Sequence, residues 1–154
     1  MGHIESKMSV KVPVETAFDY IANPANRPEW LDTTLEVKNI SEGPIGVGTS
    51  WTEVAKIAGR TIEQVRTVTE YERPRRYVME FAVFGAKTGK FDITFEPEAG
   101  GTRIAFIFDY TLPAAALGKI ADKVLLERRL SKTFGHDTST LRMVLESEQA
   151  GSSA

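Results

Sequence analysis

Apolar and polar positions alternate at the start of the chain and then change period. Over residues 4–12 the apolar side chains fall on one side and the charged ones on the other, which is typical of a half-buried strand. Residues 14–21 carry apolar side chains at helical spacing and predict a short amphipathic helix. Pro24 ends that helix, because the residue before a proline is driven out of the helical region. Pro28 suits the first turn of a second short helix over residues 28–31.

Six further segments have the pattern of strands. They are separated by turn sequences rich in glycine and proline, such as EGPIGVG, ERPR and EPEAGG. Consecutive strands at this spacing favour an antiparallel meander. The predicted strands are residues 34–40, 49–56, 60–71, 76–84, 90–96 and 102–112.

The last third of the chain has the pattern of one long helix. Residues 114–148 contain no proline, and apolar side chains recur through them at helical spacing. Such a helix is ~50 Å long at 1.5 Å per residue and crosses most of a small domain. Residues 150–154, GSSA preceded by alanine, are expected to be a disordered tail. The chain is therefore predicted to be a single domain over residues 1–149.

This order of elements predicts an α+β fold with seven antiparallel strands. The strands in series expose one apolar face, and the C-terminal helix is the element able to cover it. A bent sheet wrapped around one helix closes its core less tightly than two flat layers do. An internal cavity is therefore expected between the sheet and the long helix.

The composition of the chain argues against several classes of function. The 154 residues have ordinary apolar and charged fractions of 42% and 26% and a net charge of −2, which argues against nucleic acid as the main partner. No apolar run is long enough to span a membrane, and no secretory signal pattern opens the sequence. With no cysteine and two histidines, a metal site is not expected, nor is a cofactor. We expect a cytoplasmic protein, monomeric or homodimeric.

Four segments of the sequence resemble the START superfamily, also called SRPBCC or birch-pollen-allergen-like. They are SVKVPVETAFDYIANPANRPEW, VGTSW, TEYERPRRYVMEF and GGTRIAFIFDYTLP. Within that superfamily the chain looks like a member of the branch named polyketide cyclase/dehydrase and lipid transport. The resemblance implies a helix-grip fold, in which the sheet curves around the C-terminal helix, with a cavity whose entrance lies near the two short helices. It does not imply one activity, because members bind or process many apolar molecules.

The turn IAGR sets a strand register without reference to any family. If Ala58 and Gly59 form a two-residue hairpin loop, Trp51 pairs with Arg66, and Glu53 pairs with Gln64. The face that carries these side chains is assigned to the interior, because the opposite face is mostly threonine, lysine and glutamate. The same alternation turns these side chains inward on the later strands: Tyr77, Met79, Phe81 and Val83; Phe91, Ile93 and Phe95; Ile104, Phe106, Phe108 and Tyr110.

Glu53, Gln64 and Arg66 are the polar residues on this otherwise apolar surface. A buried carboxylate or guanidinium costs several kcal/mol unless it is paired, so a contact between Glu53 and Arg66 is expected. Arg66 is also placed for a cation–π contact with Trp51 worth about 0.5–2 kcal/mol. Three interpretations remain open: these polar residues orient a ligand carbonyl, hydroxyl or carboxylate, they form a self-satisfied ion pair, or they lie on an outward-facing edge of the sheet. If the protein is a catalyst, Glu53, Arg66 and Tyr110 are the candidate catalytic residues.

Other residues give weaker indications. Arg128, Ser131 and Thr138 lie near the apolar stripe of the long helix and either face the pocket or form a solvated edge, the second being favoured. Asp92 and Asp109 fall on the outward side of their strands, and His136 points away from the helical stripe.

Trp30 is either a core anchor or a contact at the rim, the first being favoured. The predicted ligand-binding residues are Trp30, Trp51, Glu53, Gln64, Arg66, Met79, Phe81, Phe91, Phe106, Phe108, Tyr110 and Phe134.

Three functions fit these observations. The favoured one is binding of a small hydrophobic ligand, such as a lipid, a quinone or a polyketide-like molecule, without chemical change. The second is an aromatase/cyclase-type enzyme that folds a poly-keto chain, although a carboxylate held by an arginine is a poor base. The third, which rests on the resemblance, is a ligand-dependent regulator or a chaperone-cofactor-like partner.

Overall fold

The chain folds in the predicted order of elements. The structure is a computed structural model that describes residues 2–57, 59–83, 87–110 and 123–153. The first part holds β1 (Gly2–Val10), α1 (Val14–Ala22), a 3₁₀ turn (Pro24–Asn26) and α2 (Arg27–Trp30). The remaining elements are β2 (Thr34–Lys38), β3 (Ser50–Ile57), β4 (Arg60–Glu72), β5 (Arg76–Val83), β6 (Lys87–Glu98), β7 (Gly101–Tyr110) and α4 (Lys123–Ser153).

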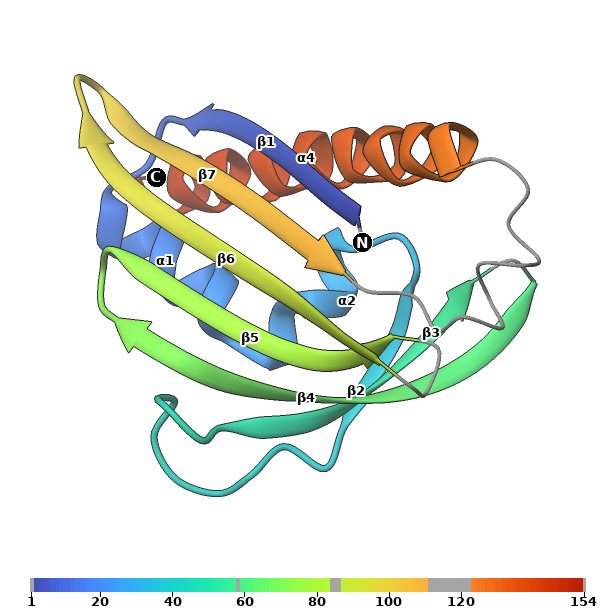
Figure 1. Cartoon of the computed structure of the whole chain (residues 1–154). Helices are drawn as coiled ribbons and strands as arrows, with labels where there is room; N and C mark the ends of the chain where they lie inside the picture. Colours follow the sequence, from blue (N-terminus) through green and yellow to red (C-terminus); the bar gives the residue numbers. More distant parts are fainter. Residues whose placement is uncertain (1, 58, 84–86, 111–122, 154) are drawn as a thin grey trace.

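The seven strands form one antiparallel sheet in the order β1-β7-β6-β5-β4-β3-β2. Figure 1 shows this sheet curving over α1 and α2, with α4 lying behind β1 and β7. Register shifts at Thr34/Glu36 and Val68/Glu70 interrupt the pairing of β2 and of β4, and such irregularities bend strands. The predicted α+β helix-grip architecture is confirmed.

The ends of several elements differ from the prediction. The expected strand ends at 84 and 111–112, and the first part of the expected long helix, residues 114–122, lie outside the described residues. At the other end α4 continues to Ser153, whereas the sequence predicts disorder from residue 150. Alanine and serine are tolerated in a helix, and no proline interrupts the segment. The division into one domain and a tail stays a prediction.

The register predicted from the IAGR turn is confirmed. Trp51 pairs with Arg66, Glu53 with Gln64, and Ile57 with Arg60. Gly59 has a φ of +80°, a conformation that glycine adopts without the strain that a Cβ would bring. The inward face deduced from this register is buried, because Trp51 and Glu53 are each 1% exposed.

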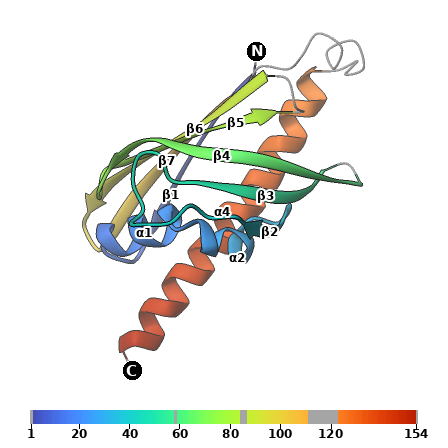
Figure 2. The same cartoon turned by 90° about the horizontal axis from the view of Figure 1, so that it is seen from below.

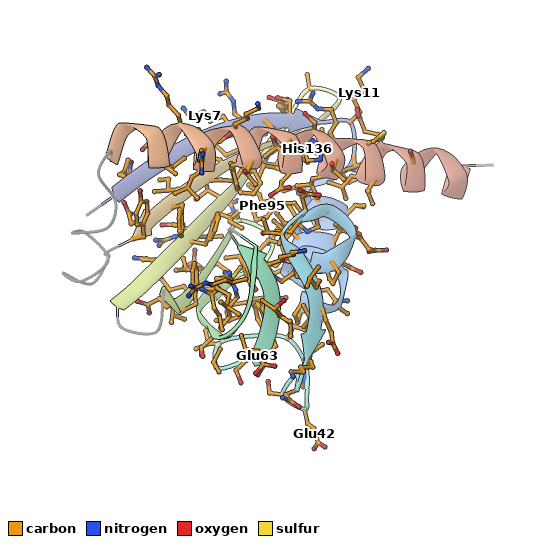
Figure 3. The ribbon with its side chains drawn as sticks, turned by 90° about the vertical axis from the view of Figure 1, so that its right-hand side faces the viewer. Lys7, Lys11, Glu42, Glu63, Phe95 and His136 are labelled. Carbon is orange, nitrogen blue, oxygen red and sulfur yellow. The ribbon has the colours of Figure 1, made fainter. Side chains whose placement is uncertain are left out.

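One end of the core is filled by α1. Phe18 is fully buried and packs edge-on against Tyr71, Tyr77 and Phe95, with ring centroids 5.0–6.4 Å apart. In Figure 3 Phe95 lies in the middle of the molecule, whereas Lys7 and Lys11 lie at its surface. Close-packed aromatic rings leave no room for a guest at this end.

At the other end of the core the sheet faces α4 and, at one side, α2 and the residues that follow it. Figure 2 shows this helix crossing beneath the sheet at an angle to the strands. The C-terminal half of α4 packs tightly, since Leu141 and Leu145 are 0% and 1% exposed, and Arg142 Nε donates to the Ser9 carbonyl at 3.1 Å. Nearer its start, Leu130 and Phe134 are only half-buried. The sheet and helix therefore diverge toward the start of α4.

Candidate functional site

A cavity of about 390 Å³ lies where the sheet and α4 diverge. Small-molecule sites have volumes of about 300–1,000 Å³, so this space suits a compact ligand. The rim includes Leu31 and Thr33, just after α2, which agrees with the expected entrance near the short helices. The sheet wall is formed by Phe81, Phe91, Phe106, Phe108 and Tyr110, and the helix wall by Arg129, Leu130, Thr133, Phe134 and Asp137.

The floor of the cavity is an ion-pair network centred on Glu53. One carboxylate oxygen accepts from Arg27 Nε and from Trp51 Nε1, the latter at 3.2 Å. The other accepts from Thr34 Oγ1 at 3.0 Å and from Arg27 Nη2 at 3.3 Å, and it lies 3.2 Å from Arg66 Nε. A carboxylate offers about four acceptor positions, so Glu53 is saturated by the protein itself.

This network keeps Glu53 ionised. Burial by itself raises the pKa of Glu53, but the charges of Arg27 and Arg66 and the hydrogen bonds from Arg27 and Trp51 outweigh it and lower the pKa to about 2. The side chain is therefore a fixed negative charge at neutral pH rather than a proton acceptor.

Arg66 is less completely satisfied than Glu53. Its Nη2 donates to Gln64 Oε1 at 3.0 Å, whereas its Nη1 approaches only the sulfur of Met79, at 3.8 Å. A thioether is a weak acceptor, so a guanidinium with five N–H groups keeps unused donor capacity in this arrangement. Burial lowers the pKa of Arg66 and the charge of Glu53 opposes this, so the group stays charged at neutral pH. Arg66 thus presents a cation to the cavity.

The expected cation–π pair has different partners. Arg66 lies over Phe81, with its Cζ 3.8 Å from the ring centroid, and Arg27 lies 5.7 Å from the Trp51 ring instead. The reason is geometric, because Arg66 stands opposite Phe81 on β5 as well as opposite Trp51 on β3, and Arg27 fills the space beside Trp51.

The apolar wall is a row of nearly parallel rings. Phe81 and Phe108 are 5.9 Å apart with a 4° angle between planes, and Phe91 and Phe108 are 4.8 Å apart at 25°. Tyr110 extends the row at 5.2 Å from Phe108, and its ring lies against Gly2 on the neighbouring strand β1, where a Cβ would meet it. Stacked rings cover one another's faces, so this wall presents an apolar surface to the cavity and suits an apolar guest.

Of the polar residues on the helix wall, Asp137 is the buried one. It is 4% exposed, and its Oδ1 accepts from the backbone N–H of Asp32 at 3.0 Å, which ties α4 to the segment after α2. Burial raises the pKa of Asp137, and the Asp32 hydrogen bond partly opposes this. The Asp137 carboxyl therefore takes up a proton at a higher pH than Glu53 does.

Nine of the twelve predicted ligand-binding residues line the cavity, and three lie behind its wall. Trp51 supports Glu53 from below, Met79 lies beside Arg66, and Trp30 is a 3% exposed core residue whose ring is 6.4 Å from that of Phe106. Contact with a ligand stays a prediction for all twelve. The nine are Glu53, Gln64, Arg66, Phe81, Phe91, Phe106, Phe108, Tyr110 and Phe134.

Sequence reasoning missed Arg27 and Asp137. Arg27 belongs to a single helical turn, and four residues are too few for periodicity to assign a face. Asp137 gave a usable signal, because it stands seven residues after Leu130 and four before Leu141, on the apolar stripe of α4.

The polar residues of the long helix that were expected at a solvated edge lie there in the structure. Arg128 and Ser131 are exposed, and Thr138 donates to the Gly135 carbonyl at 3.0 Å. His136 is exposed. On the outer face of the sheet, Asp92 pairs with Arg76 at 2.7 Å, and Asp109 pairs with His3.

Comparison with known proteins identifies the family of this chain. A family model described as polyketide cyclase / dehydrase and lipid transport matches residues 1–146, which is nearly the whole chain. No curated protein matches the sequence.

Within the described residues, no helix has the length and apolar character needed to cross a membrane.

Solved structures share the fold at low identity. Ara h 8.0201 has a TM-score of 0.65 at 15% identity, with coverage of 95% of this chain and 98% of its own. The di-domain ARO/CYC StfQ from the steffimycin biosynthetic pathway reaches 0.76 at 14% identity, with coverage of 97% of this chain and 51% of its own. A conserved protein from Geobacillus kaustophilus reaches 0.77 at 10% identity, with coverage of 94% and 95%. These likenesses concern the fold alone.

Proposed function

This chain belongs to the polyketide cyclase/dehydrase and lipid transport family, and we propose that it binds a small hydrophobic molecule in the cavity between its sheet and α4. The observation that carries the proposal is the cavity of about 390 Å³, walled by parallel phenylalanine rings. The opposite end of the same core is closely packed around Phe18. An apolar space of this size beside a well-packed core supports a place for a guest.

The energetics also favour an apolar guest. A molecule that buries about 200 Å² of apolar surface gains about 5 kcal/mol at about 25 cal/mol per Å², before the cost of association. Glu53 needs no ligand to offset its charge, because Arg27 and Arg66 already compensate it. The cavity is therefore expected to bind and release its guest without unfolding.

Binding is favoured over catalysis by the acid–base properties of the floor. Glu53, with its pKa lowered to about 2, is a poor base at neutral pH. Burial raises the pKa of the nearby Tyr77 to about 12, so its hydroxyl is a poor acid. A cyclase would have to rely on Arg66 to polarise a carbonyl, which orients a substrate but moves no proton.

A cavity-filling variant tests the proposal. Thr133 lines the helix wall, so Thr133→Trp places an indole in the space where the guest is expected. Binding is followed by the fluorescence of N-phenyl-1-naphthylamine, a neutral apolar probe. The control is Lys132→Trp, an exposed position one residue earlier on α4.

The wild type is expected to bind the probe, the Lys132→Trp control to bind it within about twofold, and Thr133→Trp to lose at least tenfold in affinity. Equal affinity for all three proteins means that the probe binds elsewhere and refutes the proposed site.

A further inference from the structure

The residues that line the cavity carry a net positive charge, whereas the whole chain carries a net negative charge. Four cationic side chains reach the cavity, Arg27, Lys56, Arg66 and Arg129, against the carboxyl groups of Glu53 and Asp137. The entire chain carries a net charge of −2. Cationic groups are thus concentrated at the one concave apolar site described above, and charge lining a cleft selects guests of opposite charge.

The excess positive charge is located at the deep end. Arg27 and Arg66 are 4% and 7% exposed, and the one carboxylate paired with either of them among the described residues is Glu53. Among the described residues Asp137 forms no ion pair with either arginine, and its Oδ1 accepts from the backbone N–H of Asp32. Two guanidinium groups therefore share one carboxylate in a nearly water-free place, where an uncompensated charge is costly.

Arg66 supplies the donors for a second anion. Among the described residues, the one hydrogen-bond partner of its Nη1 is the Met79 sulfur at 3.8 Å, and its Nη2 donates to Gln64 Oε1. The guanidinium is stacked on Phe81, the ring that begins the parallel row with Phe108. An oxyanion bound at Arg66 would therefore lie at one end of the apolar space that these rings line.

From this arrangement we propose that the guest is an amphipathic anion, a carboxylate on an apolar body, with the carboxylate bound at Arg66 beside Gln64 and the body against Phe81, Phe91 and Phe108. The inference rests on the proposed function, since it assigns the ligand class of the same cavity. A charge-assisted hydrogen bond from a buried arginine gives about one to two orders of magnitude in affinity.

A matched pair of probes separates the charge of the guest from its apolar body. Titration calorimetry at pH 7 compares 1-pyrenebutyrate with 1-pyrenebutyramide, which has nearly the same shape and no charge. The wild type is expected to bind the carboxylate at least tenfold more tightly than the amide. This comparison needs no variant protein.

The decisive variant is Gln64→Glu, which is isosteric and still accepts from Arg66 while adding the negative charge that the ligand would bring. It is expected to lower affinity for pyrenebutyrate at least tenfold and to lower affinity for the amide by a clearly smaller factor. The control is Val65→Glu, which makes the same change of net charge at an exposed position one residue later on β4. This control variant is expected to leave the affinities for both probes within twofold of the wild type.

The possible outcomes distinguish a failure of the carboxylate assignment from a failure of the proposed function. If both probes bind the wild type equally, the cavity binds apolar guests but the carboxylate assignment is overturned. A Gln64→Glu protein that keeps full preference for the carboxylate also overturns it. If neither probe binds the wild type, the proposed function itself fails, and the ligand class fails with it.

Discussion

Replacing Glu53 by glutamine tests the ion-pair floor, because the change removes one charge and nearly no volume. In the folded protein the pKa of Glu53 is about 2, against an ordinary value of 4.5. A depressed carboxylate pKa stabilises the fold at pH values above the ordinary one, and this stabilisation is lost as pH falls toward the folded value. This lowering of the pKa corresponds to about 3 kcal/mol at pH 7.

The variant also leaves Arg27 and Arg66 buried without a carboxylate, and breaking a buried pair in this way costs about 3–5 kcal/mol. We therefore expect Glu53→Gln to lower the free energy of unfolding by about 3–5 kcal/mol at pH 7. At pH 3 the wild type has itself lost about 2 kcal/mol of the contribution from Glu53, so the gap between the two proteins should shrink by that amount.

The assay is urea unfolding followed by circular dichroism at several pH values between 7 and 3. Glu42→Gln, in the exposed loop between β2 and β3, is the matched control and should change stability by less than about 0.5 kcal/mol. A gap between wild type and Glu53→Gln that stays constant from pH 7 to pH 3 would refute the reasoning, because Glu53 could then not be an ionised, ion-paired group in the folded state.

The other predictions concern two glycines and use the same unfolding assay. A Cβ on Gly101 would lie 2.0 Å from the Val10 carbonyl oxygen, so Gly101→Ala should cost about 2–3 kcal/mol. Gly46→Ala, where a Cβ meets nothing within 4 Å, is its control, and equal stability of the two variants would contradict the close approach. Gly135 lies within α4 with open space around it, so Gly135→Ala should raise stability by about 0.5–1 kcal/mol, and a loss of stability would show that the glycine is needed there.

The fold was predictable because short-range signals determine most of it. A two-residue hairpin at Gly59 fixes the pairing of Trp51 with Arg66, and the period of two then assigns an inner face to each following strand. Pro24 and Pro28 mark the break between the short helices as they do in the structure. None of these deductions needs knowledge of distant contacts.

The site was only partly predictable, because its polar network joins elements far apart in the sequence. Arg27 reaches Glu53 across 26 positions, and Asp137 reaches Asp32 across 105. Periodicity says which face a residue occupies and not which partner it meets, so Arg66 was expected over Trp51 and lies over Phe81. Whether a predicted inward side chain lines the cavity or supports its wall, as Met79 does, depends on packing that no local pattern encodes.

A crystal structure of the protein purified from its own host tests the central claim most directly. The account predicts non-protein electron density between the sheet and α4, in contact with Arg66 at one end and with the ring of Phe91 along its length. A structure in which the phenylalanine side chains close this space, with no room for a guest, would contradict it.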